Sequence, residues 1–173
     1  MRKLIFLSFS TFFSAFLHSQ QVVDLEENAT YKYNGIEYGF YISNEQSKEV
    51  KGEEYDRFEV NLFVRNSSGC VKVIPFKVGM TQSTDEDITI AEFMCRNATG
   101  KRLTAKSGKI LTKPWYTLVK VNDEKATDKY KFINAEAGHA IGNGQTIKTK
   151  IIVIVPKGER PKMACTIVDF PGM

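Results

Sequence analysis

Hydrophobic and polar residues alternate most regularly in residues 142–161, which contain the clearest strand of the chain. The opposite face of that strand starts with Lys148 and Lys150 and becomes apolar after them. We therefore expect it to enter a sheet at a solvated edge and to end between two layers, as a core strand of a β-sandwich. Five residues spaced two apart share its apolar face: Ile147, Thr149, Ile151, Val153 and Val155.

Further short β-rich runs follow one another along the chain, separated by turn residues and without an amphipathic helix. The Asn34-Gly35 pair predicts a hairpin inside the first run, whereas Pro75 favours an edge strand or a bulge. The polar residues 43–56 are expected to form a loop or a short surface helix. About eight or nine strands in all predict an all-β fold, an antiparallel β-sandwich. The runs are residues 31–42, 57–65, 70–78, 88–95, 115–121, 130–133 and 163–170.

Turns and strands follow a recognisable order at the end of the chain. A glycine-rich turn precedes the long strand, a Pro156-Lys157-Gly158 turn follows it, and a final strand ends the sequence. This arrangement resembles the end of many bacterial immunoglobulin-like domains. The resemblance covers the last third of the chain and implies an immunoglobulin-like sandwich, and because it rests on turn residues it implies no particular function.

The first residues have the pattern of an export signal. Arg2 and Lys3 precede an apolar run over residues 4–17, and Ser19 and Gln20 follow it. The apolar run is too short to span a bilayer comfortably, and no later run is longer. We expect a cleaved signal peptide over residues 1–20, one β-sandwich domain over residues 21–173, no transmembrane segment, and a periplasmic or extracellular location.

Charge is nearly balanced in the remaining residues. The chain has 24 Lys and Arg against 20 Asp and Glu, and loss of Arg2 and Lys3 with the signal leaves 22 against 20. Such a balance argues against a nucleic-acid partner, which would favour a strong basic excess. Residues 101–113 are a local exception to this balance because they contain no acidic residue. This basic stretch predicts either a solvated hairpin or a surface that binds anionic polymers. It includes Lys101, Arg102, Lys106 and Lys109.

Three cysteines, Cys70, Cys95 and Cys165, are compatible with an oxidising compartment. If the runs that contain Cys70 and Cys95 formed one hairpin, these two residues would come within one position of facing each other. Facing residues in antiparallel strands are close enough for a disulfide. We therefore expect a Cys70 to Cys95 disulfide, with three reduced and mostly buried thiols as the alternative.

No pattern in the sequence predicts a cofactor or a metal site. His139 is the only histidine after the expected signal peptide, and it lies in a glycine-containing stretch that favours a surface loop. The stretch around His139 has neither an HExxH motif nor a second histidine to complete a zinc site, and no GxSxG motif is present. A small hydrolase that pairs His139 with a cysteine or serine nucleophile remains an alternative function.

Aromatic residues suggest a different function. Trp115 and Tyr116 would point to opposite faces of a strand, and Tyr31 and Tyr33 lie in the predicted hairpin. Exposed on a sheet, such rings would bind a glycan or a partner protein, whereas the alternative is that they pack in the core.

The absence of any complete catalytic set makes a non-enzymatic, secreted binding module the leading prediction, with an unknown protein or glycan as its partner. A second alternative is a structural subunit of a surface assembly, which an unpaired edge strand would favour.

Overall fold

The computed structural model describes residues 21–50, 52–75, 87–99, 105–122 and 129–167. None of these residues forms a helix, so none of them forms a helix long and apolar enough to cross a membrane. The predicted signal peptide lies outside the described residues. Eleven strands account for the regular structure: β1 (Gln21–Leu25), β2 (Thr30–Tyr33), β3 (Ile36–Val50), β4 (Glu53–Asn66), β5 (Lys72–Pro75), β6 (Ile88–Cys95), β7 (Ser107–Thr112), β8 (Pro114–Asn122), β9 (Tyr130–Ile141), β10 (Thr146–Pro156) and β11 (Met163–Ile167).

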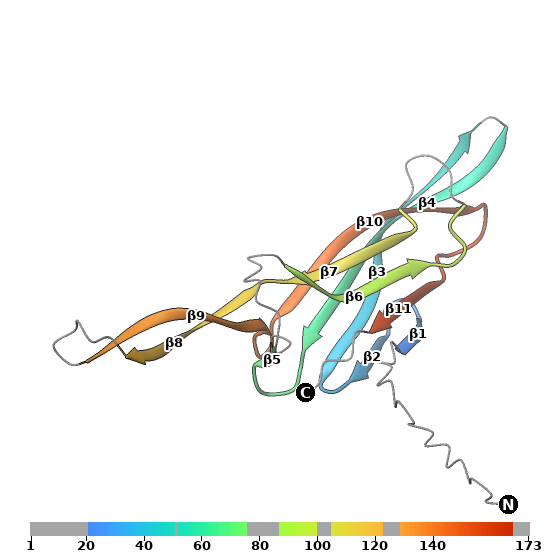
Figure 1. The fold of residues 1–173 in the computed structure, drawn as a ribbon. Helices are drawn as coiled ribbons and strands as arrows, with labels where there is room; N and C mark the ends of the chain where they lie inside the picture. Colours follow the sequence, from blue (N-terminus) through green and yellow to red (C-terminus); the bar gives the residue numbers. More distant parts are fainter. Residues whose placement is uncertain (1–20, 51, 76–86, 100–104, 123–128, 168–173) are drawn as a thin grey trace, which may run out of the picture.

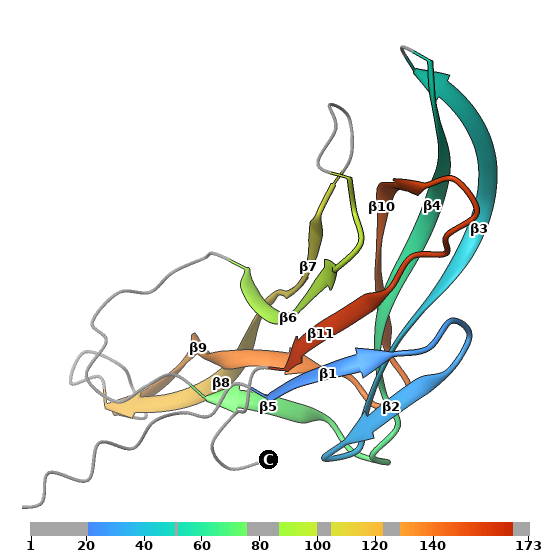
Figure 2. The ribbon, with the colours of Figure 1, turned by 90° about the vertical axis from the view of Figure 1, so that its right-hand side faces the viewer.

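These strands form three sheets, in which every pairing is antiparallel, so the all-β antiparallel prediction is confirmed. The orders are β1-β11-β6-β7, β10-β4-β3-β2 and β5-β9-β8. Figure 2 shows the two four-stranded sheets as two layers, and Figure 1 shows β8 and β9 extending away from them. The buried residues of both four-stranded sheets belong to one hydrophobic core.

A glycine in β7 marks the close approach of the two layers. A Cβ atom added to Gly108 would lie 2.6 Å from Cδ1 of Leu62 in β4 and 2.8 Å from Cγ2 of Ile151 in β10. Those distances are shorter than any packing contact, so a larger side chain would push the layers apart. Dense packing between the sheets therefore requires glycine at this position.

The hairpin of β2 and β3 forms where the sequence predicts it. Tyr33 faces Ile36 across the turn, and Asn34 and Gly35 both have positive φ, 49° and 77°. This is the conformation of a type I′ turn, whose twist matches that of the flanking strands and which favours Asn-Gly. The prediction from the Asn-Gly pair is confirmed.

The predicted alternation of β10 is also confirmed. Ile151, Val153 and Val155 are buried, while Lys148 and Lys150 are exposed. β10 lies at the edge of its sheet, where the segment that leads from β6 into β7 covers part of its outer side. The N–H groups of Ala105 and Thr99 donate to the carbonyls of Ile152 and Ile154 at 2.7 and 2.9 Å. Residues that follow β6 and precede β7 are thus hydrogen-bonded to the outer edge of β10.

Residues 43–56, which we expected to form a loop or a short helix, instead continue β3 and begin β4. The ladder between the two strands runs from the Ile36–Asn66 pair to the Val50–Glu53 pair, with a bulge between Ile42 and Asn44. Gly52, in the turn that joins the strands, has φ 78°. The hydrogen bonds of a β-ladder satisfy the backbone N–H and C=O groups of polar residues as well as those of a helix do. A hairpin in water does not require apolar side chains at every second position. The prediction missed this strand because it relied on apolar alternation.

A buried carboxylate attaches this long hairpin to the turn between β10 and β11. Asp56 accepts hydrogen bonds from the N–H of Gly158 and from the hydroxyl of Ser47, both at 2.7 Å. The bond from Gly158, followed by that from Ser47, lowers the pKa of the Asp56 carboxyl. Each bond stabilises the charged form of the side chain, so the contact is formed by the carboxylate.

The hairpin that we expected between the strands at Cys70 and Cys95 does not form. β5 pairs with β9, whereas β6 pairs with β11 and β7 in another sheet. Cys70 is exposed, Cys95 and Cys165 are buried, and all three are free, so the predicted Cys70 to Cys95 disulfide is wrong. The sequence shows which segments are strands, but an antiparallel strand can pair with any other, and the assumed neighbours were not the real ones.

A buried asparagine joins four separate parts of the chain. The side chain of Asn66, at the end of β4, is 0% exposed. Its Nδ2 donates to the carbonyls of Cys70 and Ile141 at 2.7 and 2.8 Å, and its Oδ1 accepts from the N–H and hydroxyl of Ser68. Its backbone N–H and C=O bond with the turn over residues 142–145. β4, β9 and the segments that lead into β5 and β10 therefore meet at one residue.

Replacement of Asn66 by alanine leaves the carbonyls of Cys70 and Ile141 without their donor, and a buried polar group without a partner costs about 1–3 kcal/mol. We expect Asn66→Ala to lower the free energy of unfolding by about 3 kcal/mol in urea titrations. Asn61→Ala, on the same strand and outside this network, is the control and should cost less than about 1 kcal/mol. Equal losses in the two variants would contradict the role assigned to Asn66.

Thiol reactivity follows from the positions of the cysteines. Burial raises the pKa of Cys165 to about 12 and also raises that of Cys95. Because the thiolate is the reactive form, we expect Cys70 alone to react quickly with a thiol reagent in the folded protein. All three should react in denaturant without a reductant, and Cys70→Ser should remove only the fast phase. If only one thiol reacted in denaturant without a reductant, two of the cysteines would have to be joined by a disulfide, contrary to the structure.

Candidate functional site

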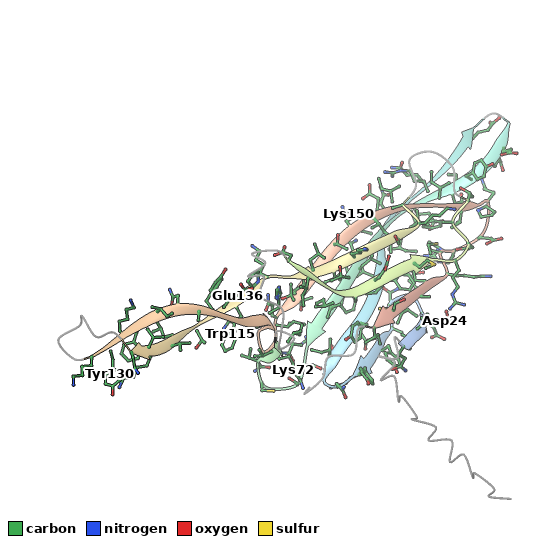
Figure 3. All side chains as sticks on the ribbon, viewed as in Figure 1. Asp24, Lys72, Trp115, Tyr130, Glu136 and Lys150 are labelled. Carbon is green, nitrogen blue, oxygen red and sulfur yellow. The ribbon has the colours of Figure 1, made fainter. Side chains whose placement is uncertain are left out.

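The β8–β9 hairpin is a two-stranded ribbon fixed to the rest of the molecule at one end. β8 and β9 pair along their length, but β5 pairs only with Gly138 to Ile141 of β9. Among the described strands, β8 alone pairs with residues 130–137 of β9, and none pairs with the outer edge of β8. Figure 1 shows the ribbon pointing away from the two layers, and Figure 3 shows side chains on both of its faces.

Three kinds of contact hold the base of the ribbon. The ladder with β5 is the first, and the bond from Asn66 to the carbonyl of Ile141 is the second. The hydroxyl of Thr112, buried at the end of β7, donates to the carbonyl of Ala140 at 2.7 Å. The base is therefore tied to both four-stranded sheets, and the rest of the ribbon extends from a fixed support.

A bulge lies where the ribbon leaves this support. Trp115 faces Gly138, whereas the next residue, Tyr116, faces Glu136, so Ala137 is an extra residue in β9. Gly138 has φ 139°, in the region that favours glycine. Bulges increase the local twist and redirect a strand. The sequence thus sets the direction of the ribbon through one glycine.

Most of the large apolar side chains that are exposed in the described residues lie on the ribbon. Leu118 and Phe132 are each 67% exposed, which is more than any of the others. Those outside the ribbon are single residues on four different segments: Val22, Val71, Met94 and Leu111. Scattered apolar residues are normal on a surface, but a group of them on one element marks an interaction site. The ribbon group is Trp115, Tyr116, Leu118, Val119, Tyr130, Phe132 and Ile133.

The pairing register divides the ribbon into two faces, because residues opposite each other in an antiparallel pair lie on the same side. We call them the aromatic face and the aliphatic face. On the aromatic face, Nζ of Lys120 lies 3.8 Å from the centre of the Tyr130 ring. The aromatic face carries Tyr116, Leu118, Lys120, Tyr130 and Phe132, and the aliphatic face carries Trp115, Thr117, Val119, Ile133 and Ala135.

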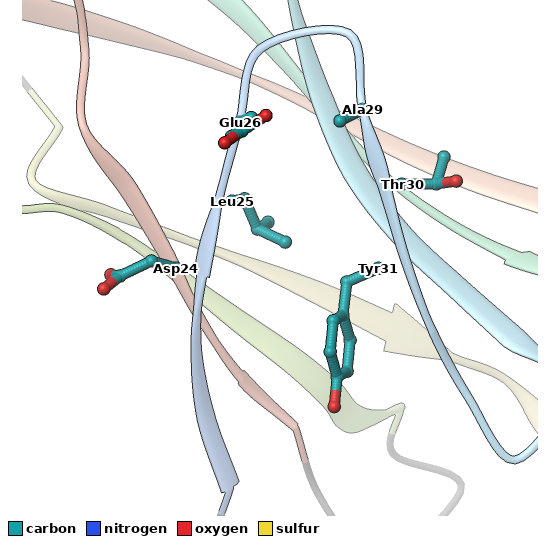
Figure 4. Close-up of a pocket in the computed structure, with 6 residues that line it drawn as sticks. All are labelled: Asp24, Leu25, Glu26, Ala29, Thr30 and Tyr31. Carbon is teal, nitrogen blue, oxygen red and sulfur yellow. The ribbon is translucent and has the colours of Figure 1, made fainter.

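Of the binding residues predicted from sequence, two lie on this site and two do not. Trp115 and Tyr116 are 41% and 48% exposed on opposite faces, so neither packs in the core. Tyr31 and Tyr33 lie in β2, in another sheet, and are half-buried against the core. Figure 4 shows Tyr31 beside an open hollow next to β1, where its hydroxyl accepts a hydrogen bond from Nε2 of Gln21 at 2.9 Å.

The structure describes only two of the four residues of the predicted basic surface. Lys101 and Arg102 lie outside the described residues, and Lys106 and Lys109 are exposed. Lys109 lies directly opposite Glu92 in the pairing of β6 with β7. The carboxylate of Glu92 opposite Lys109 partly offsets the positive charge of that lysine.

His139, expected in a surface loop, is instead buried in β9 between Ile74 and Pro114, with 2% of its surface exposed. Burial lowers the pKa of its imidazole, while the carboxylates of Glu136 and Asp87 oppose this shift. A neutral histidine so deeply buried cannot reach a substrate in solution, and the buried thiols are far from being thiolates. His139 therefore lies in the core, and not in the surface loop that the sequence predicts.

Metal binding finds no support in the described ranges. No three His, Cys, Asp or Glu side chains among those residues lie close enough together to hold an ion.

Sequence reasoning missed most of the ribbon group, although it identified both strands. The predicted strands include Leu118, Val119, Tyr130, Phe132 and Ile133, but no sequence motif marks these residues for binding. Their signal was that both runs are apolar on two faces while being short and bounded by charged residues. Such a run indicates either a fully buried strand or an exposed apolar one, and only its surroundings distinguish the two.

Comparisons of this chain with family models, with curated proteins and with solved structures gave no match.

A pH dependence follows from the burial of His139, the only histidine in residues 21–173. Its folded pKa lies below the usual 6.5, so below that pH the unfolded chain binds more protons than the folded one. We expect the free energy of unfolding to be constant above about pH 7.5. It should fall as the pH drops from about 6.5 towards 5, by at most about 1.4 kcal/mol per pH unit.

Urea unfolding from about pH 5 to 8 measures this slope, and the single histidine resonance in the NMR spectrum gives the pKa directly. His139→Gln, whatever its overall stability, should remove the slope, since carboxylates titrate mostly below that range. A histidine pKa at or above 6.5 would contradict the burial of this side chain.

Proposed function

We propose that this chain is an exported, non-enzymatic interaction module that binds a partner through the β8–β9 ribbon. The observation that carries the proposal is the gathering of seven exposed large apolar side chains on one projecting ribbon. Burial of a Leu or Phe side chain contributes about 1.5–3 kcal/mol. Covering Leu118 and Phe132 would therefore contribute about 3–6 kcal/mol, a large share of the roughly 8 kcal/mol of a micromolar complex.

The rest of the fold supports this role by giving the ribbon a fixed base. We include in the proposal a signal peptide over residues 1–20 and an immunoglobulin-like sandwich for the two four-stranded sheets. The sandwich is supported by their common hydrophobic core and antiparallel strands. Binding residues on a rigid support lose less conformational freedom when the partner arrives, so more of the burial energy appears as affinity.

A protein partner fits the ribbon better than a glycan. Trp115 and Tyr116 lie on opposite faces and cannot form one stacking platform. The most exposed residues are Leu118 and Phe132, and the aliphatic face offers Val119 and Ile133, which give a sugar few hydrogen bonds. Apolar and aromatic side chains without many charges are typical of the centres of protein interfaces.

The test compares the chain from Gln21 with the double variant Leu118→Ser/Phe132→Ser and with the control Met94→Ser. Met94 is 50% exposed on β6, away from the ribbon. Each of the three proteins is immobilised and probed with a defined glycan array and with the secreted proteins of the source cells, at low and at physiological salt.

We expect at least one protein to bind wild type and Met94→Ser equally at both salts, and to lose about 100-fold or more in affinity for the double variant. Glycan binding that depends on Trp115 or Tyr116 would replace the protein partner with a sugar. Partners that bind the double variant as well as wild type would refute the proposed function of the ribbon.

A further inference from the structure

The outer edge of β8 is long and carries almost no charge. Its nine residues include a single charged side chain, Lys120. An exposed edge strand presents unpaired backbone N–H and C=O groups, and proteins usually protect such edges with charges, proline, bulges or short length. Pro114 restricts only the first position of β8, and the bulge at the base inserts its extra residue into β9. In the part of the chain that the structure describes, no strand pairs with the outer edge of β8 over residues 117–122, so this edge is open to a further strand.

Other sheet edges in the described part of the chain are protected. β1, β2 and β5 have five residues or fewer. β10 carries Lys148 and Lys150, and its outer side accepts hydrogen bonds from Ala105 and Thr99. β7 lies beside β10 and carries Lys109. The outer edge of β9 over residues 130–137 carries Lys131 and Glu136 and includes the bulge residue Ala137, and the outer edge of β3 beyond Gly39 carries Glu45 and Glu49. Of the edges in the described residues, β8 alone combines length, low charge and exposed apolar side chains.

We propose that β8 pairs antiparallel with β8 of a second copy of this chain, giving a continuous sheet in the order β9-β8-β8-β9. This inference rests on the proposed function of the ribbon and names its partner. A two-fold axis through the strand pair makes both copies equivalent, as in most homodimers. Four strands also form a stable sheet, whereas an isolated pair of strands is marginal.

The residues of β8 are complementary to themselves about Leu118. With Leu118 on the two-fold axis, Thr117 faces Val119 of the second copy, and Trp115 faces Val121. Tyr116 faces Lys120 of the second copy, a cation beside an aromatic ring of the kind that Lys120 already forms with Tyr130. Aromatic and β-branched residues opposite one another are the pairs that stabilise antiparallel sheets.

Charge does not oppose this pairing. The two Lys120 side chains would be four residues apart along the strands, about 13 Å. That distance exceeds the Debye length of about 8 Å at physiological ionic strength, so their repulsion is screened. A strand with two or more lysines, such as β10, would place like charges closer together. A second copy therefore fits β8 without any change of sequence.

Sedimentation velocity of the chain from Gln21, up to about 0.2 mM, measures the dimer. Leu118→Lys and Leu118→Glu each place like charges opposite each other on the two-fold axis, so each should raise the dissociation constant about 100-fold or more. An equimolar mixture of the two variants should dimerise again. Met94→Lys adds the same charge elsewhere and should dimerise as wild type does.

Cross-linking tests the register. In a Cys70→Ser background, Leu118→Cys should form an intermolecular disulfide with the same position of the second copy, because facing residues are within disulfide distance. Lys120→Cys, which faces Tyr116, should not. Near-UV circular dichroism and the melting temperature verify that each variant is folded.

A wild-type protein that remains monomeric, or a dimer that survives both charge variants, would overturn this inference. The proposed function would still stand if an unrelated protein lost binding to Leu118→Ser/Phe132→Ser. If neither self-association nor any other binding depended on the ribbon, both proposals would fail.

Discussion

The central position of β4 is the constraint on which the rest of the structure depends. It pairs with β3 on one side and with β10 on the other along most of its length, so its backbone groups are satisfied without water. Its inner side chains face the second sheet and lose all contact with solvent, which supplies the main hydrophobic stabilisation. These residues, all 0% exposed, are Phe58, Val60, Leu62 and Val64.

The ribbon takes its position from the end of that strand. Asn66 is the last residue of β4 and bonds to Ile141 at the end of β9, while Thr112 bonds to Ala140. Beyond these contacts no second layer covers β8 and β9 in the described residues, so an apolar pattern that would be core elsewhere is exposed. A site carried by strands on a fixed base keeps its geometry better than one on a loop.

Local features were predicted well because they depend on few residues. The Asn34-Gly35 turn requires two positive φ angles that these residues adopt readily, and it formed as predicted. In β10, the alternation of Ile151, Val153 and Val155 with lysines gave the correct buried face. At the candidate site, sequence identified Trp115 and Tyr116, but grouped them with Tyr31 and Tyr33, which belong to another sheet.

Predictions that required knowledge of strand partners were wrong. Cys70 and Cys95 were expected in one hairpin, yet β5 pairs with β9 and β6 with β11 and β7. His139 was expected in a loop because glycines surround it, but a ladder on both sides of β9 buries it. Backbone hydrogen bonds are the same for every residue except proline, so they carry little information about which strands will meet.

The sequence by itself determined where the chain turns and which side chains share a face of a strand, because φ preferences and the period of two are local properties. Only the tertiary structure decided which faces became core and which stayed in water. The same alternation buries Val60 in β4 and leaves Leu118 exposed in β8. The difference between them is the presence of a second sheet, which depends on residues far away in the chain.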